Sequence, residues 1–191
     1  MSPMMSEAVQ QSLEVLRKGG LILYPTDTVW GVGCDATNVE AVQRVYDLKR
    51  SENKKAMIVL CGTLDMAARY ISRPPAIAFD VMEVTTKPLT VIMPGGVGVA
   101  ANLIPEEGTL AIRIPDHEFC KELLRRFGKP IVSTSANISD EATPLSIDGV
   151  CEAIVTGVDY VVNPKLSKGA TGRPSSIMQF DLDGGFKIIR E

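Results

Sequence analysis

The sequence predicts an α/β fold in which helices flank a mixed β-sheet. Short apolar runs bounded by glycine or proline alternate with segments of helical periodicity, the pattern of a layered domain. The middle strands follow turns that are too short for crossover helices, so antiparallel neighbours are expected beside parallel ones. With 191 residues, 45% of them hydrophobic and 23% charged, the chain has the composition of one globular domain over residues 1–191.

The first elements are a helix, a buried strand and a second helix. Ser6 is a suitable N-cap for the first helix, and Gly19 with Gly20 supplies the left-handed residue that ends it. The short apolar run 21–24 lies between this glycine pair and a proline, which indicates a buried strand. Apolar residues then recur at helical spacing over residues 39–49, which predicts a βα step.

The rest of the chain continues the alternation. Apolar runs predict strands at 57–60, 89–93, 110–114, 131–133, 160–162, 177–180 and 186–189. Helical patterns occupy 64–70, 76–83, 118–127 and 147–155, the last with Ser146 as its cap. The segment 163–174 is rich in glycine, proline and basic residues, so it is expected to be a mobile loop over a site.

Composition excludes several classes of protein. The net charge of -3 and the pI near 5.3 argue against a broad nucleic-acid-binding face, although a local basic patch is compatible with them. The four cysteines are widely spaced, so they indicate neither a zinc site nor a disulfide framework. No leader segment or apolar run of membrane-spanning length is visible, and a cytoplasmic location is expected.

Several common catalytic motifs are absent from the sequence. A hydrolase triad is not expected, because the chain has one histidine and no G-x-S-x-G elbow. Neither the G-x-x-x-x-G-K-[ST] loop nor a strand-linked G-x-G-x-x-G motif occurs. A nucleotide would have to be held in another way.

Two motifs early in the chain could serve a site. The segment 24–33 (Tyr-Pro-Thr-Asp-Thr-Val-Trp-Gly-Val-Gly) places hydroxyls and a carboxylate where a buried strand ends, the edge at which ligands bind in α/β sheets. It could equally be a turn whose hydroxyls satisfy local backbone groups. The basic stretch 49–55 could bind a triphosphate or an RNA backbone, or it could be a solvated surface that meets a helix dipole.

Two later motifs also follow apolar strands. Arg113 closes a strand and must pair with an anion, either a structural aspartate or a substrate phosphate. His117 stands at a helix start, where a capping or packing role is more plausible than a general base. In the segment 130–139, alternation sends Ser133 and Ser135 to one side, so both hydroxyls can face one ligand.

Taken together, the Pro-Thr-Asp-Thr segment with its glycines, Arg-Ile-Pro-Asp-His at 113–117 and Ser-Thr-Ser-Ala-Asn at 133–137 resemble the YrdC family of threonylcarbamoyl-adenylate synthases. The resemblance implies a twisted, mixed β-sheet flanked by helices around a concave cleft. It also implies the short form of the family, without an additional C-terminal domain. The implied reaction converts ATP, L-threonine and bicarbonate to threonylcarbamoyl-AMP and pyrophosphate, for modification of a tRNA adenosine.

The resemblance also implies partners and roles for individual residues. Mg²⁺ would accompany ATP, partner proteins would complete the transfer to tRNA, and contact with tRNA or double-stranded RNA is possible. Catalytic roles would fall to Lys49, Arg50 and Arg113, and threonine would contact Thr28, Ser133 and Ser176. The residues expected to face ATP are Lys49, Lys55, Thr90, Ser135, Asn137, Thr143 and Arg190.

Two departures touch the expected ligands of the family. Ser51 stands where the family usually has an arginine, and Leu60 stands where a histidine is common. Two alternatives therefore stay open. One is a YrdC-like paralogue that binds RNA or a nucleotide without synthase activity, and the other is a related enzyme for another amino acid or carboxylate.

Overall fold

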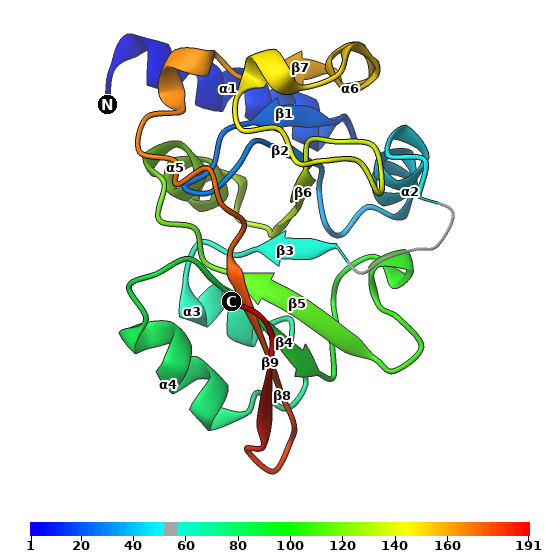
Figure 1. Cartoon of the computed structure of the whole chain (residues 1–191), viewed down its shortest axis with the longest axis vertical. Helices are drawn as coiled ribbons and strands as arrows, with labels where there is room; N and C mark the ends of the chain where they lie inside the picture. Colours follow the sequence, from blue (N-terminus) through cyan, green and yellow to red (C-terminus); the bar gives the residue numbers. More distant parts are fainter. Residues whose placement is uncertain (52–56) are drawn as a thin grey trace.

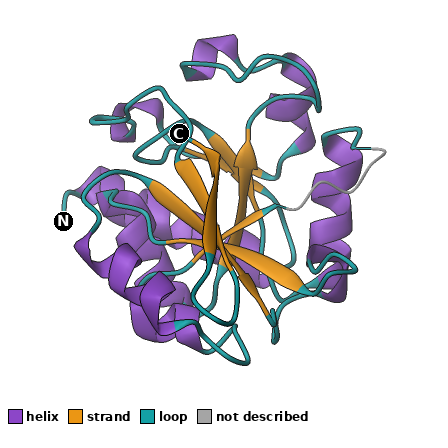
Figure 2. Cartoon of the chain, turned by 60° about the horizontal axis from the view of Figure 1, so that its bottom comes forward, coloured by secondary structure: helices purple, strands orange, loops and turns teal. Residues whose placement is uncertain are grey.

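The computed structural model describes residues 1–51 and 57–191, which form one mixed β-sheet with helices on both faces (Figures 1 and 2). The α-helices are α1 (Pro3–Arg17), α2 (Val39–Leu48), α3 (Leu64–Ala68), α4 (Ala76–Val84), α5 (Glu118–Phe127) and α6 (Glu152–Gly157). The 3₁₀ turns are η1 (Ala101–Leu103), η2 (Ile147–Gly149) and η3 (Pro164–Leu166). The strands are β1 (Ile22–Tyr24), β2 (Gly31–Gly33), β3 (Ile58–Leu60), β4 (Leu89–Pro94), β5 (Thr109–Arg113), β6 (Ile131–Ser135), β7 (Tyr160–Val161), β8 (Ser176–Phe180) and β9 (Phe186–Arg190).

The strands run in the order β7-β1-β2-β6-β3-β5-β4-β8-β9 within the described residues. The pairs β1/β7, β3/β5 and β4/β8 are parallel, and the other neighbours are antiparallel. The expected mixed sheet is therefore confirmed. In Figure 1 the β8–β9 hairpin hangs at the lower end of the molecule, with the C-terminus beside β3 and β5 in that view.

Two hydrophobic clusters hold the helices to the sheet. Leu23 of β1 lies in the cluster that includes buried residues of α2, α3, α4 and α6. Its neighbours Ile22 and Tyr24 point to the opposite side, into the cluster with α1 and α5. Successive side chains of a strand face opposite sides, so a strand covered on both faces must be apolar throughout. This is why the run at 21–24 has no polar position.

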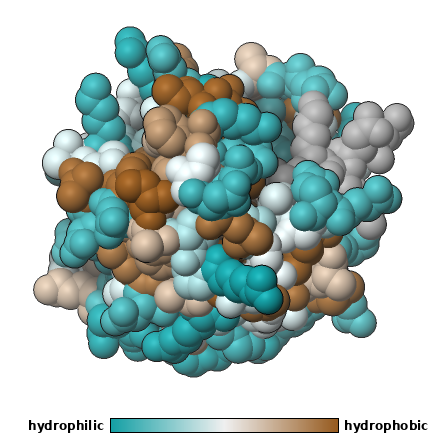
Figure 3. Space-filling view, turned by 90° about the horizontal axis from the view of Figure 1, so that it is seen from below, coloured by the Kyte–Doolittle hydropathy of each residue, from teal (hydrophilic) through white to brown (hydrophobic). Residues whose placement is uncertain are grey.

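The surface around the β8–β9 hairpin mixes hydrophobic and hydrophilic residues (Figure 3). Phe186, Ile188 and Ile189 of β9 are all exposed. Phe186 also packs against the buried ring of Phe180, with 5.7 Å between the ring centroids. Among the helices in the described part of the chain, none has the length and apolar character needed to cross a lipid bilayer.

The structure corrects the predicted start of the first helix. Ser2, not Ser6, is its N-cap, and the Ser2 hydroxyl accepts a hydrogen bond from the backbone N–H of Met5. Ser6 lies one turn inside the helix, where its own N–H donates to the carbonyl of Ser2. Pro3 fits this arrangement because the first helical position needs no N–H donor.

Two other elements differ from the sequence prediction. The segment 31–33, expected as part of a loop, is strand β2 between β1 and β6. The helix expected over 147–155 is instead the turn η2 and the separate helix α6, and Ser146 makes no side-chain cap hydrogen bond. The remaining predicted strands and helices are present, with ends that differ by a residue or two.

Candidate functional site

A cleft of about 320 Å³ opens where the segment 24–33 meets β6 and the start of β8. The predicted site residues in its wall are Thr28, Arg113, Ser133, Ser135, Thr143 and Arg190. A smaller cavity of about 160 Å³ shares Met57, Thr134 and Ser135 with it. The predicted residues Lys49 and Asn137 line this second cavity. The two cavities are therefore neighbouring parts of one site.

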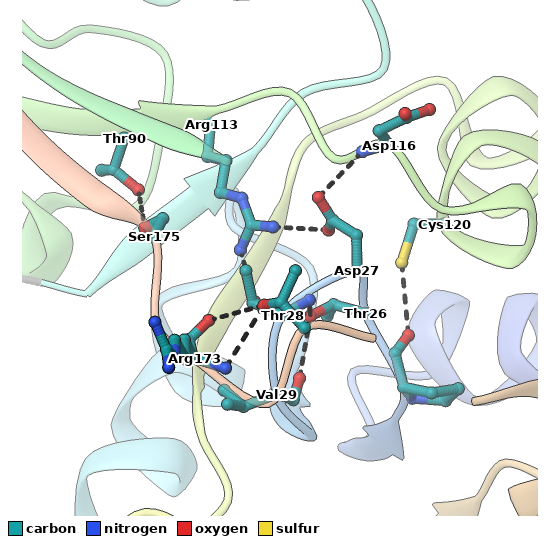
Figure 4. Close-up of polar contacts among 12 residues, drawn as sticks. Thr26, Asp27, Thr28, Val29, Thr90, Arg113, Asp116, Cys120, Arg173 and Ser175 are labelled. Atoms are coloured by element: carbon teal, nitrogen blue, oxygen red, sulfur yellow. Dashed lines mark hydrogen bonds and ion pairs between the residues drawn. The ribbon is translucent and has the colours of Figure 1, made fainter. Parts of the chain in front are cut away.

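The loop after β1 is held in place by a buried ion pair. Nη2 of Arg113 lies 2.5 Å from Oδ1 of Asp27, and Nη1 of Arg113 donates to Oγ1 of Thr28 at 2.8 Å (Figure 4). The second carboxylate oxygen of Asp27 accepts the backbone N–H of Asp116 at 3.2 Å. Of the two anions that the sequence allowed for Arg113, the structure places the aspartate beside it. The Nε of Arg113 is buried without a partner in the described residues.

Lys49 is buried although it carries a cationic side chain. Only 7% of the residue is exposed, and its Nζ donates to the backbone carbonyls of Ser135 and Asn137, each at 2.6 Å. Burial lowers the pKa of Lys49 to about 8, since low-dielectric surroundings disfavour the charged form. Lys49 follows the last residue of α2, and its backbone N–H caps the helix by donating to Val45.

Asn137 presents an unused acceptor beside Lys49. Its Nδ2 donates to the carbonyls of Ile138 and Glu141, at 2.9 and 3.0 Å. Its Oδ1 is buried and accepts no hydrogen bond from the described residues. A buried acceptor without a partner is costly, so a donor group on a ligand would be favoured there.

Ser175, the residue directly before β8, faces the cleft in place of the predicted Ser176. Ser175 is buried and lines the cleft, and its hydroxyl is 2.7 Å from the hydroxyl of Thr90 (Figure 4). Ser176 does not line either cavity. Thr90 is fully buried and reaches the site only through Ser175. Because strand residues alternate, a shift of one position exchanges the serine that points inward.

Arg190 closes the cleft from β9. Its Nε and Nη2 both donate to the carbonyl of Ser175, at 3.0 and 2.7 Å. Burial and the positive charge of Arg113 both lower the pKa of Arg190. A like charge in the same cleft is unfavourable for both arginines, so an anionic ligand would relieve it.

Other predicted residues lie away from the two cavities or outside the described residues. Arg50 is exposed, has a φ of 51° and lines neither cavity. Lys55 lies outside the described residues. Ser51 lines the smaller cavity, whereas Leu60 is fully buried in the cluster with α1 and α5 and lines neither.

His117 sits at the N-cap of α5, without a side-chain cap hydrogen bond. It is buried, and burial lowers its pKa, which keeps the imidazole neutral near pH 7. It lines neither cavity, which agrees with the packing role expected for it. The loop 163–174 does border the site, because the backbone N–H groups of Thr171 and Gly172 donate to the carbonyls of Asp27 and Thr28, each at 2.9 Å.

Sequence reasoning missed two residues of the site. Asp27 was noted only as part of its loop, and its pairing with Arg113 joins positions 86 residues apart. Ser175 is adjacent to the predicted Ser176. Alternation along the strand places the two serines on opposite faces, but the sequence does not tell which face meets the cleft. The described residues include no group of three or more His, Cys, Asp or Glu side chains that could hold a metal ion.

The family model of the Sua5, YciO and YrdC proteins, described as "Telomere recombination", matches residues 14–191. The threonylcarbamoyl-AMP synthase of Hahella chejuensis is 34% identical over 171 residues, covering 88% of this chain and 91% of the relative. The synthase of Pseudoalteromonas translucida is 31% identical over 172 residues, with the same coverage of 88% and 91%.

Solved structures share the fold. E. coli YciO superposes with a TM-score of 0.81 at 23% identity, over 97% of this chain and 89% of that one. P. abyssi Sua5, in complex with L-threonine, gives a TM-score of 0.80 at 23% identity, over 90% of this chain. This chain spans 50% of that longer Sua5 chain.

Proposed function

Because the chain belongs to the Sua5/YciO/YrdC family, we propose that it is a threonylcarbamoyl-AMP synthase. The proposed reaction joins L-threonine, bicarbonate and ATP to give threonylcarbamoyl-AMP, pyrophosphate and water, the water being released when the amine and bicarbonate form the carbamate. The product would serve the threonylcarbamoylation of a tRNA adenosine, with partner proteins completing the transfer and tRNA as a possible contact. The names of the curated relatives and the threonine complex of P. abyssi Sua5 support this proposal.

The observation that carries the proposal is the pair of adjoining cavities with different chemistry. The larger one combines hydroxyl groups with Arg190, and the smaller one contains the cation of Lys49. Met57, Thr134 and Ser135 are common to both walls. An amino acid held in one cavity would therefore lie next to a nucleotide held across the other, as a condensation between them requires.

The proposed chemistry needs positioning rather than a covalent nucleophile. The carbamate formed from threonine and bicarbonate would attack the α-phosphorus of ATP in line, and pyrophosphate would leave with the electrons of the broken P–O bond. Lys49 and Arg190 would stabilise negative charge on the phosphates. Ser135, Asn137 and Thr143 would orient the nucleotide through hydrogen bonds.

Magnesium fits this site as part of the substrate. Asp140 is a carboxylate in the wall of the smaller cavity, and Asp27, which lines neither cavity, is engaged by Arg113. Within the part of the chain that the structure describes, no three or more His, Cys, Asp or Glu side chains form a group that could hold a metal ion. Mg²⁺ commonly binds through substrate phosphates and water in nucleotide sites. MgATP would thus enter as one unit, with this chain contacting the phosphates.

A second candidate is a family member that binds RNA or a nucleotide without catalysing the reaction. The observation that favours it is Ser51, which lines the smaller cavity where the resemblance led us to expect an arginine. One fewer guanidinium would weaken the stabilisation of phosphate charge. Leu60 favours neither candidate, because this side chain is buried away from both cavities.

The deciding experiment is pyrophosphate release from MgATP by the purified chain. Release is expected only when both L-threonine and bicarbonate are present, with serine and reactions lacking either compound as controls. Binding of ATP or RNA without any threonine-dependent release would replace the proposal with the binding module. Release that depends on another amino acid would retain the chemistry but change the substrate.

A further inference from the structure

The segment 167–174, which we call the strap, joins η3 to β8 and crosses the loop that follows β1. All of its side chains are exposed or only partly buried. Two backbone N–H groups attach it to the site, because those of Thr171 and Gly172 donate to the carbonyls of Asp27 and Thr28, each at 2.9 Å. A segment that buries little surface and makes few hydrogen bonds opens more easily than the helices and strands around it.

Two glycines of the strap adopt left-handed backbone conformations. Gly169 has a φ of 87°, and Gly172 has a φ of 68°. A Cβ at either position would meet no atom within 4 Å, so glycine is needed there for its backbone conformation rather than to avoid a clash. The strap can therefore change its course on both sides of Thr171, one of the two residues that attach it.

The strap contributes to the walls of two cavities. Pro174 lines the cleft, whereas Gly169 and Thr171 line a separate cavity of about 590 Å³ that also has Asp27 in its wall. Arg173 lines neither of them, but it directly precedes Pro174 and so stands at the rim of the cleft. Opening of the strap would therefore change the wall of the cleft at this rim.

The backbone of Arg173 is held in place while its side chain is exposed. The hydroxyl of Thr171 accepts the backbone N–H of Arg173 at 3.2 Å and donates to the carbonyl of Arg173 at 3.1 Å (Figure 4). In the same view Arg173 lies beside Thr28. Its guanidinium forms no hydrogen bond or ion pair with the residues that the structure describes. The N–H donors of this side chain are thus available at the rim of the cleft.

The charges around the cleft suit a ligand with several negative charges. Arg113 is paired with Asp27, but Arg190 donates only to a neutral carbonyl. Lys49, in the adjoining cavity, likewise donates to two backbone carbonyls. Arg173 adds a third cation that has no carboxylate partner in the described parts of the chain. A polyphosphate matches such a set, because its oxygens can accept from several cationic donors at once.

We propose that Arg173 is a further substrate-contacting residue, which binds the β- and γ-phosphates of the nucleotide and thereby holds the strap against the site. The inference rests on the proposed function for the class of ligand. The phosphate contact would add a third anchor to the two backbone hydrogen bonds of the strap. It would also bring a guanidinium to the charge that builds up on the leaving pyrophosphate, although Ser51 stands where the resemblance led us to expect an arginine.

Digestion with trypsin measures how often the strap opens. Trypsin cleaves after lysine but not after an arginine that precedes proline, so Lys168 is the cleavage site within the strap. A non-hydrolysable MgATP analogue should slow cleavage after Lys168 by about tenfold, whereas adenosine, which has no phosphate, should not slow it. Lys18 is also exposed and also precedes a glycine, so it is the internal control. A ligand that only stabilised the whole fold would slow both cleavages alike.

Arg173→Gln separates a phosphate contact from a structural role. The variant should lose the protection after Lys168 and bind the ATP analogue about tenfold more weakly in calorimetry. Its affinity for AMP, which lacks the β- and γ-phosphates, should stay unchanged, whereas a structural defect would weaken both ligands. Arg73→Gln is the matched control, because Arg73 is an exposed arginine that also precedes a proline, and it should behave as the wild type does.

A second variant tests the strap without touching Arg173. Gly172→Ala places a Cβ at a positive φ, which strains the attached conformation, so cleavage after Lys168 in the free protein should be about fivefold faster. Gly108→Ala is the matched control, since Gly108 has a φ of 69° and equally open surroundings. It should leave the cleavage rate unchanged.

The outcomes distinguish the inference from the proposed function. No protection of Lys168 in the wild type, undiminished protection in Arg173→Gln, or an equal loss of ATP and AMP affinity would overturn the inference. Threonine-dependent pyrophosphate release together with any of these results would leave the proposed function standing alone. Protection that depends on Arg173, without such release, would support the inference and reject the proposed reaction.

Discussion

The Nζ of Lys49 lies 2.6 Å from the carbonyl oxygen of Ser135 and 2.6 Å from that of Asn137, which joins the end of α2 to the end of β6. No described carboxylate lies within ion-pair distance of this ammonium group. Two neutral carbonyls compensate a buried charge only partly, and burial lowers the pKa of Lys49 to about 8. The lysine is thus held ready for an anion at a cost to stability.

Lys49 should make the stability of the protein depend on pH in the alkaline range. In the unfolded chain the lysine pKa is about 10.4, so between pH 8 and 10 the unfolded state binds more protons and stability rises with pH. Relative to Lys49→Met, the wild type should gain up to about 1.4 kcal/mol of unfolding free energy per pH unit there. Urea unfolding of both proteins at several pH values measures this difference.

The comparison with Lys49→Met cancels the contributions of other groups, such as the buried Cys61 thiol with a pKa raised to about 12. Lys187→Met, which removes an exposed lysine of β9, controls for the general loss of a positive charge. A difference between wild type and Lys49→Met that stays flat from pH 7 to 10 would show that Lys49 is not held against desolvation.

Arg190 should contribute to nucleotide binding more than to folding. Its guanidinium donates to one carbonyl of Ser175 and faces the like charge of Arg113, so it has capacity left for phosphate oxygens. Arg190→Ala should weaken ATP binding by at least tenfold, about 1.4 kcal/mol, as measured by calorimetry. Its thermal unfolding should change little, because β9 is an exposed edge strand.

The matched control is Arg125→Ala, which removes an exposed arginine of α5 that pairs with Glu122. This variant should bind ATP as the wild type does. If Arg190→Ala also binds ATP normally, the nucleotide phosphates do not reach this end of the cleft.

The order of strands and helices was largely predictable because both faces of the sheet are covered and the strands read as apolar runs. β2 could not be found in this way. Its sequence, Gly-Val-Gly, has weak strand propensity, and pairing with β1 and β6 alone defines it. The role of Ser2 as N-cap was not predictable, because Ser2 and Ser6 both precede helical patterns and only the backbone geometry distinguishes them.

The candidate site was predictable where polar residues follow a strand directly. Thr28, Ser133 and Ser135 meet in one cleft because β1 and β6 both border β2. The partner of Arg113 was not predictable, because Asp27 lies 86 residues away and the sequence allowed a substrate phosphate equally well. The position of Ser175 depended on the register of β8 against β4, which periodicity does not determine.

Gly33 should be indispensable for packing at the centre of the fold. A Cβ at this position would lie 2.4 Å from the carbonyl oxygen of Val132 and 2.8 Å from the ring of Tyr24. Both neighbours are buried and cannot move freely, so Gly33→Ala should lower the unfolding free energy by about 1–3 kcal/mol. Gly185→Ala, whose Cβ would meet only the side chain of Asp181, should be nearly neutral in the same denaturant titration. Equal stability of the two variants would refute this packing argument.

The ion pair between Asp27 and Arg113 should show strong energetic coupling. Both residues are almost completely buried, at 7% and 4% exposure, and the carboxylate also accepts the backbone N–H of Asp116. Removing one partner leaves the other charge buried and unpaired, so Asp27→Leu or Arg113→Met should cost about 3–5 kcal/mol each. The double variant should cost clearly less than the sum, by about 1–3 kcal/mol.

Denaturant unfolding of the wild type, both single variants and the double variant completes this cycle. The control cycle uses Glu122→Ala and Arg125→Ala on the surface of α5, where solvent screens the charges and the coupling should be far smaller. Additive costs for Asp27 and Arg113 would show that the two charges do not depend on each other, which would contradict this prediction.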